Sequence, residues 1–117
     1  MKISEVRDLL DAKVISGEEL LDREVYSACG SDMMSDVLAY VKDQSVLLTG
    51  LVNSQVIRTA EMMDMVCIVF VRSKMPTEEM ISLAKEMDIA LLATDKRMYN
   101  ACGRLYAGGL RGNGVRK

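Results

Sequence analysis

The sequence has no histidine and no tryptophan, and only one proline and one phenylalanine among its 117 residues. Without histidine, the side chain that most often serves as a general base and metal ligand near neutral pH is missing. With so few aromatic rings, the core must come from aliphatic residues and from the ten methionines, whose flexible side chains adapt to irregular spaces. These absences exclude histidine-dependent catalytic sites and predict an aliphatic, methionine-rich core.

Long hydrophobic runs are also absent. The longest run, residues 65–71, is far shorter than the roughly 20 apolar residues that a membrane-spanning helix needs. The first residues, Met1 to Glu5, lack the apolar stretch of a signal peptide. Three cysteines, an odd number without paired spacing, favour reduced thiols. We therefore expect a cytoplasmic protein with no membrane contact.

Motifs for phosphate loops, dinucleotides and metal clusters are missing too. Cys29, Cys67 and Cys102 are too dispersed for a zinc or iron–sulfur motif, so no metal and no cofactor is predicted. Cys67 and Cys102 are expected in the core, whereas Cys29 is either a core residue or an exposed, reactive thiol. No catalytic residue stands out, and the prediction is a protein that is not an enzyme.

The charge is nearly balanced, with 15 basic and 17 acidic residues and a net charge of −2. No basic face with interleaved aromatic residues is visible, so nucleic acid is not an expected partner. Basic residues gather at the end of the chain, where Arg111, Arg116 and Lys117 follow Gly108 among four glycines. We predict one domain over residues 1–107 and a flexible, glycine-rich basic tail over 108–117, either solvated or touching a partner.

Three short apolar runs, at 45–49, 65–71 and 89–93, lack the polar alternation of a half-exposed strand. Such runs are typical of parallel strands that are covered on both faces. Apolar residues with helical spacing follow each run. The less regular first part adds strands at 12–16 and 23–29. The chain is therefore predicted to form a layered α/β fold, a mostly parallel sheet with flanking helices.

The starts of the helices are predicted from proline and from short polar side chains. Pro76 followed by two glutamates marks one start, and Asp95 is a candidate cap for the last helix. The other candidate caps are Ser4, Ser31 or Asp32, and Asn53 or Ser54.

Ligands of open parallel sheets bind beyond the carboxyl ends of the strands. This rule selects the loops at residues 30–32, 49–54, 72–75 and 94–96. Their mixture of hydroxyls, amides, two acids and three cations suits a polar or phosphorylated ligand. Helix capping alone also explains several of these polar residues. Arg72 and Lys74 are not needed as caps, although an ordinary solvated loop also tolerates them. The predicted ligand-binding residues are Thr49, Gly50, Asn53, Ser54, Arg72, Ser73, Lys74 and Thr94.

Four segments follow the pattern of a known family. They are the leader at 2–17, the strand and glycine turn at 46–50, the strand and proline-led helix start at 68–76, and the last strand and its Thr-Asp turn at 91–95. On these segments the chain resembles a stand-alone DRTGG domain, a module found attached to some phosphotransacetylases and between paired CBS domains.

The resemblance implies a fold like the N-terminal domain of HPr kinase/phosphorylase and a homodimer. Two departures fall on the residues that name the family: Leu51 and Val52 replace its Asp-Arg pair, and Arg72-Ser73-Lys74 replaces its Thr-Gly-Gly turn. The segments at 29–38 and 49–53 resemble small DRTGG proteins encoded beside genes of iron-only hydrogenases and NADH-oxidising complexes in anaerobes.

The sequence is compatible with two functions. The first is a non-catalytic regulatory or sensory module that binds a nucleotide-like or phosphorylated small ligand. The alternative is a protein-interaction module or accessory subunit of a redox system, with Met62, Met63, Met65 and Met75 forming either a contact patch or part of the core.

Overall fold

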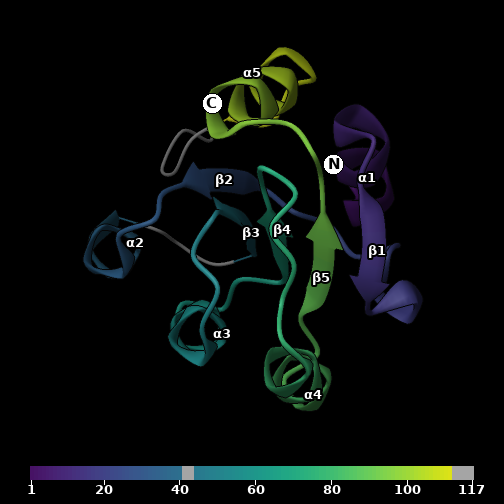
Figure 1. The fold of residues 1–117 in the computed structure, drawn as a ribbon. Helices are drawn as coiled ribbons and strands as arrows, with labels where there is room; N and C mark the ends of the chain where they lie inside the picture. The colour runs from purple at the N-terminus through teal and green to yellow at the C-terminus, as the bar shows by residue number, and fades with distance from the viewer. Residues whose placement is uncertain (41–43, 112–117) are drawn as a thin grey trace.

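The computed structural model describes residues 1–40 and 44–111. Helices and strands alternate along the chain (Figure 1). The strands are β1 (Lys13–Ser16), β2 (Ser27–Gly30), β3 (Ser45–Thr49), β4 (Cys67–Phe70) and β5 (Ala90–Ala93). The helices are α1 (Ile3–Leu10), α2 (Met34–Tyr40), α3 (Ser54–Met62), α4 (Glu78–Glu86) and α5 (Met98–Ala107), with a short 3-10 helix η1 (Glu18–Leu20).

The strands form one sheet in the order β1-β5-β4-β3-β2. Neighbours from β2 to β5 are parallel, with Val46 opposite Cys67 and Cys67 opposite Ala90. The edge strand β1 runs antiparallel to β5. The predicted layered α/β fold with a mostly parallel sheet is therefore confirmed.

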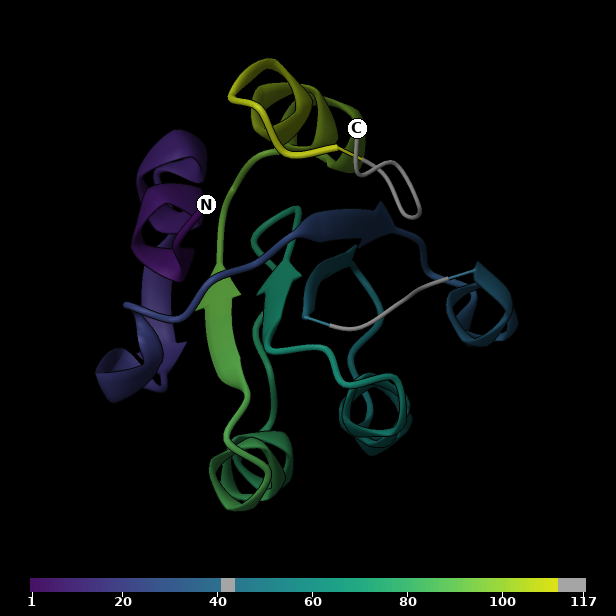
Figure 2. The same cartoon turned by 180° about the vertical axis from the view of Figure 1, so that it is seen from behind.

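Helices cover both faces of this sheet, α1 and α5 on one side and α2, α3 and α4 on the other (Figures 1 and 2). The side chains of β4 alternate between the two cores: Cys67 and Val69 face α1 and α5, whereas Ile68 and Phe70 face the other helices. Because both faces are buried, no polar residue interrupts the strand, which explains the continuous apolar run in the sequence.

Of the predicted starts of α3 and α4, the first is confirmed and the second needs correction at residue level. Asn53 caps α3 as predicted, because its Oδ1 accepts a hydrogen bond from the Val56 N–H. Pro76 lies before the start of α4, and the hydroxyl of Thr77 makes the cap by accepting from the Met80 N–H. A short hydroxyl side chain can accept this bond, whereas proline contributes its fixed backbone angle alone.

Asp95 and Ser4 are not caps, and both predictions are wrong. Helix α5 begins three residues after Asp95, with Arg97 at the cap position and no side-chain cap hydrogen bond. Ser4 lies inside α1, where the Glu5 carboxylate instead accepts a hydrogen bond from the Lys2 backbone N–H.

The sequence predicts that Met62, Met63, Met65 and Met75 form either a contact patch or part of the core. In the structure, two of them are exposed and two are fully or partly buried. Met65 is buried and Met63 is partly buried. Met62 and Met75 are 64% and 53% exposed, but one ends α3 and the other follows β4. Since these two positions belong to opposite edges of the sheet, the four methionines do not form one patch.

The described part of the expected tail packs against the domain. Leu110 is 4% exposed, and the carbonyl of Arg111 accepts a hydrogen bond from the Ala28 N–H of edge strand β2. The rest of that segment, 112–117, lies outside the described residues. In the described part of the chain, no helix is long and apolar enough to cross a membrane.

Candidate functional site

The loops that follow β2, β3, β4 and β5 meet at the carboxyl edge of the sheet, here called the rim. The N–H groups of Arg72 and Ser73 donate to the carbonyls of Lys96 and Thr94, joining the loops after β4 and β5. The Gly50 N–H donates to the Asp32 carboxylate, which joins the loops after β2 and β3. The ion pair between Arg72 and Asp32, at 3.7 Å, connects these two pairs of loops, so all four predicted loops meet at the rim.

Asp32 makes the connection between the loops after β2 and β3. Its Oδ1 accepts hydrogen bonds from the Gly50 N–H at 2.7 Å and the Thr49 hydroxyl at 2.9 Å. The Gly50 bond, helped by Thr49 and by the charge of Arg72, holds the pKa of the Asp32 carboxyl below its usual value. Ser31, the other capping candidate here, accepts from the Met33 N–H. Asp32 thus links two loops instead of capping α2.

Arg72 lies across Gly50. Its guanidinium Nη2 is 3.7 Å from Asp32 Oδ2, and both side chains are about half exposed. A Cβ atom added at Gly50 would collide with that same nitrogen, so the glycine leaves the space that the guanidinium occupies. The loose ion pair keeps Arg72 at the rim with donors left for an anion.

Thr49 and Thr94 lie beneath the rim. Thr49 is fully buried, and its hydroxyl accepts from the Leu51 N–H as well as donating to Asp32. Thr94 is 3% exposed, donates to the Leu10 carbonyl at 2.7 Å and accepts from the Lys96 N–H. Both hydroxyls therefore hold loops in place.

The remaining predicted residues are accessible. Arg72, Ser73 and Lys74 are exposed, as is Asn53, while Ser54 is half-buried in the first turn of α3. That turn contains no acidic residue, whereas α4 begins with Glu78 and Glu79. Of these two helix starts, α3 is the one compatible with a nearby anion.

The backbone at Arg72 and Ser73 is unusual. Both residues have positive φ angles, 58° and 61°, in the left-handed region that favours glycine. Their N–H groups are already bonded to the loop after β5, so an anion here would be bound by side chains. Residues 72–74 themselves carry no signal of this conformation, because hydrogen bonds to a distant loop hold it. The signal lies in the resemblance, since the family has a Thr-Gly-Gly turn here.

A hollow of about 390 Å³ opens in the rim beside β5. Ser73 and Thr94 from the predicted set line it, together with Met75, Ala93, Asp95, Lys96, Asp11 and Lys13. Sequence reasoning missed Asp11 and Lys13. They reach the rim because β1 runs antiparallel beside β5, which places its beginning at the edge where β5 ends. The Lys96 amine lies 3.5 Å from an Asp11 carboxylate oxygen.

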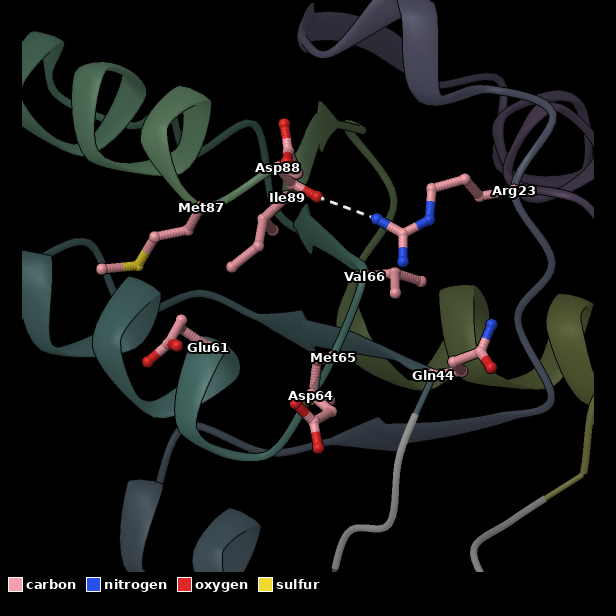
Figure 3. A pocket seen from close by; sticks show the side chains of 9 residues that line it. All are labelled: Arg23, Gln44, Glu61, Asp64, Met65, Val66, Met87, Asp88 and Ile89. Carbon is pink, nitrogen blue, oxygen red and sulfur yellow. Dashed lines mark hydrogen bonds between the residues drawn. The ribbon is translucent and has the colours of Figure 1, made fainter.

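A second hollow, of about 450 Å³, lies at the opposite edge of the sheet (Figure 3). Arg23 crosses it to donate to the Asp88 carbonyl at 3.1 Å. Glu61, Asp64 and Asp88 surround it, close to the C-terminal ends of α3 and α4. Carboxylates and negative helix ends repel an anion, so the rim is the better candidate for a phosphorylated ligand.

Cys67 is buried as predicted, whereas Cys102, which was also expected in the core, is partly buried on α5. Burial raises the pKa of all three thiols, and Cys29, the candidate reactive thiol, is half-buried with a raised pKa. A raised pKa lowers the fraction of nucleophilic thiolate. Among the described residues, no three Cys, Asp or Glu side chains gather in a group that could hold a metal ion.

The lowered pKa of Asp32 predicts a pH-dependent contribution to stability. Since the folded pKa lies below the unfolded value of about 3.9, ionised Asp32 stabilises the fold above that pH, and the effect is lost as pH falls through the folded pKa. Asp32→Asn should cost about 0.5 kcal/mol at pH 7, because a half-exposed charge is screened. In urea titrations this difference should close below about pH 4. A difference that persists unchanged to pH 3 would contradict the assignment.

The fold is similar to a solved structure. The crystal structure of the CBS and DRTGG domains of the regulatory region of Clostridium perfringens pyrophosphatase, complexed with the activator diadenosine tetraphosphate, matches with a TM-score of 0.73 and 17% sequence identity. The match covers 89% of this chain and 45% of that one, so this chain spans just under half of the matched chain's length. No curated protein sequence matches the chain.

The family resemblance seen in the sequence is confirmed independently. The sequence model of the DRTGG domain matches residues 5–107, which include all five strands and most of every described helix. The chain therefore belongs to the DRTGG domain family.

Proposed function

We propose that this chain is a non-catalytic regulatory module that binds a nucleotide-like or otherwise phosphorylated small ligand at the rim. One observation carries the proposal: Arg72 and Ser73, two exposed non-glycine residues, adopt left-handed backbone conformations side by side. Such a conformation costs about 1–2 kcal/mol for each residue with a side chain. The family has two glycines in this loop, which would avoid this strain. Because this chain has side chains here in spite of the strain, we infer that they take part in recognition.

The charges of the rim support an anionic ligand. Arg72 and Lys74 follow β4, while Lys13 and Lys96 line the hollow on the other side of Ser73. Together they place cationic donors on both sides of one loop, a suitable arrangement for a ligand with more than one phosphate. The matched pyrophosphatase region was crystallised with diadenosine tetraphosphate, which makes this compound a reasonable first probe.

The titrating groups support a role without catalysis. The described groups with resolved pKa shifts are Asp32, which is shifted downward, and the three cysteines, which are shifted upward by burial. A general base at neutral pH needs the reverse for a carboxylate, and a thiol nucleophile needs a lowered pKa.

Calorimetry and thermal shift with diadenosine tetraphosphate, ATP and inorganic pyrophosphate test the proposal. A ligand present at 100 times its Kd should add about 2.7 kcal/mol of stability. Arg72→Ala and Lys74→Ala should each weaken binding by about tenfold or more, because each removes a charge-assisted contact. Arg58→Ala is the matched control, since Arg58 is an exposed cation in the middle of α3. No binding of any probe, or equal losses in all three variants, would contradict the proposal.

The backbone strain makes a second, independent prediction. Ser73→Gly should raise the free energy of unfolding by about 1 kcal/mol, because glycine adopts the left-handed conformation without strain. The same change should weaken ligand binding if the Ser73 hydroxyl contacts the ligand. Urea denaturation and calorimetry on one preparation measure both quantities. A variant less stable than the wild type would show that the conformation is not strained.

A further inference from the structure

The outer face of α5 exposes an unusual set of side chains. Tyr99 and Tyr106 are 88% and 59% exposed, and Gly103 lies between them. The spacing of four and three residues places all three in one stripe of the helix. This stripe faces away from the sheet, because Ala101 and Leu105 form the buried face of the same helix.

A hollow of about 780 Å³ runs along this face. Its lining includes both tyrosines, Asn100, Gly103 and Arg104. Tyrosine, asparagine and glycine are also the residues that recognition loops use to bind other proteins, and tyrosine and arginine dominate the energetics of many interfaces. The composition is therefore that of a protein-binding surface.

Gly103 lines the hollow. A Cβ atom added there would meet nothing within 4 Å, so the fold itself does not require glycine at this position. Glycine is less favourable than alanine inside a helix. The absence of a side chain lets the backbone of another molecule approach α5 closely between the two tyrosine rings.

The charged residues of α5 and of the segments that flank it are all basic, although Lys96 pairs with Asp11. Residues 96–111 contain Lys96, Arg97, Arg104 and Arg111 and no acidic residue, although the whole chain has a net charge of −2. Arg104 donates to the Leu9 carbonyl, and Arg111 stacks on the Tyr106 ring at 4.2 Å from its centre. Among the described residues, neither arginine is within ion-pair distance of a carboxylate.

We propose that the outer face of α5 is a docking surface for an acidic segment of a partner protein. The segment lies against Gly103 between Tyr99 and Tyr106, and its carboxylates pair with Arg104 and neighbouring cations. A second copy of this chain is a poorer occupant, because two-fold packing about Gly103 would bring the two Arg104 side chains together. This surface does not involve Arg72, but Lys96 lines both this hollow and the one at the proposed ligand site.

Selection from a peptide-display library of random 16-residue sequences, with the full chain as bait, tests this proposal. Enriched peptides should be acidic and should bind the free chain in a fluorescence titration. Tyr99→Ala, Gly103→Leu and Arg104→Glu should each weaken binding by about tenfold or more. Arg58→Glu, on α3, makes the same charge change elsewhere and should leave binding nearly unchanged. Leucine favours helix more than glycine does, so Gly103→Leu should fold.

Three results would overturn the proposal. The first is selection of no peptide, or of peptides without net negative charge. The second is binding that the α5 variants and Arg58→Glu affect equally. The third is occupation by something else: a dimer in sedimentation that Gly103→Leu dissociates identifies a second copy, and binding of a labelled oligonucleotide that Arg104→Glu abolishes identifies nucleic acid.

Discussion

Gly17→Ala should lower the free energy of unfolding by about 3 kcal/mol, the largest effect that we expect from a single methyl group in this chain. Gly17 has a φ angle of 90°, and a Cβ atom there would lie 2.9 Å from the Ala90 Cα and 3.2 Å from the Ala90 Cβ. Two costs therefore add, the strain of a left-handed residue and a collision with the backbone of β5. A side-chain rotation relieves neither cost, because the Ala90 Cα belongs to the backbone of β5, which lies between β1 and β4 in the sheet.

Gly109→Ala separates these two costs. Gly109 has a φ angle of 111° but nothing within 4 Å of an added Cβ, so it should show the backbone strain alone, about 1–2 kcal/mol. Gly103→Ala, in an exposed helix with neither problem, should instead gain about 0.5–1 kcal/mol. Urea denaturation of the three variants measures the series. Equal losses in Gly17→Ala and Gly109→Ala would show that the contact with Ala90 relaxes without cost.

Thr94→Val should lower the free energy of unfolding by about 2 kcal/mol and leave ligand affinity unchanged. The valine keeps the shape of threonine but removes a buried hydroxyl that bonds both the Leu10 carbonyl and the Lys96 N–H. These two partners then lose a hydrogen bond at a position that water reaches poorly. The bond to Leu10 also joins the end of α1 to the end of β5, two parts of the chain 84 residues apart.

Thr94→Ser and Arg72→Ala complete this test. Serine keeps the hydroxyl, so Thr94→Ser should recover part of the lost stability, as measured by urea denaturation. Arg72→Ala should show the opposite pattern, near-normal stability with weakened binding, because the half-exposed Arg72 side chain makes a loose ion pair. If Thr94→Val folds normally but loses the ligand, Thr94 contacts the ligand directly, as the sequence alone predicted.

The residues of the rim show how far sequence reasoning reached. The loops were found because strand ends and helix starts leave local signals, and parallel strands bring their carboxyl ends to one edge. The role of Asp32 was missed, because a polar residue before a helix has the same sequence pattern whether it caps that helix or bonds the neighbouring loop. The positions of Thr49 and Thr94 beneath the surface were also not visible, since burial depends on what packs above them.

The class of fold could be predicted from the amino-acid sequence, because continuous apolar runs such as 45–49 require cover on both faces of a strand. The lack of histidine also removed the commonest catalytic chemistry, since no fold can supply a side chain that the chain does not contain. The tertiary structure alone decided that β1 lies antiparallel beside β5, which brings Lys13 to the rim. It also decided that Arg72 and Ser73 take left-handed conformations, because hydrogen bonds to a loop more than 20 residues away hold them there. Such features follow from contacts between distant segments, and local sequence patterns do not encode them.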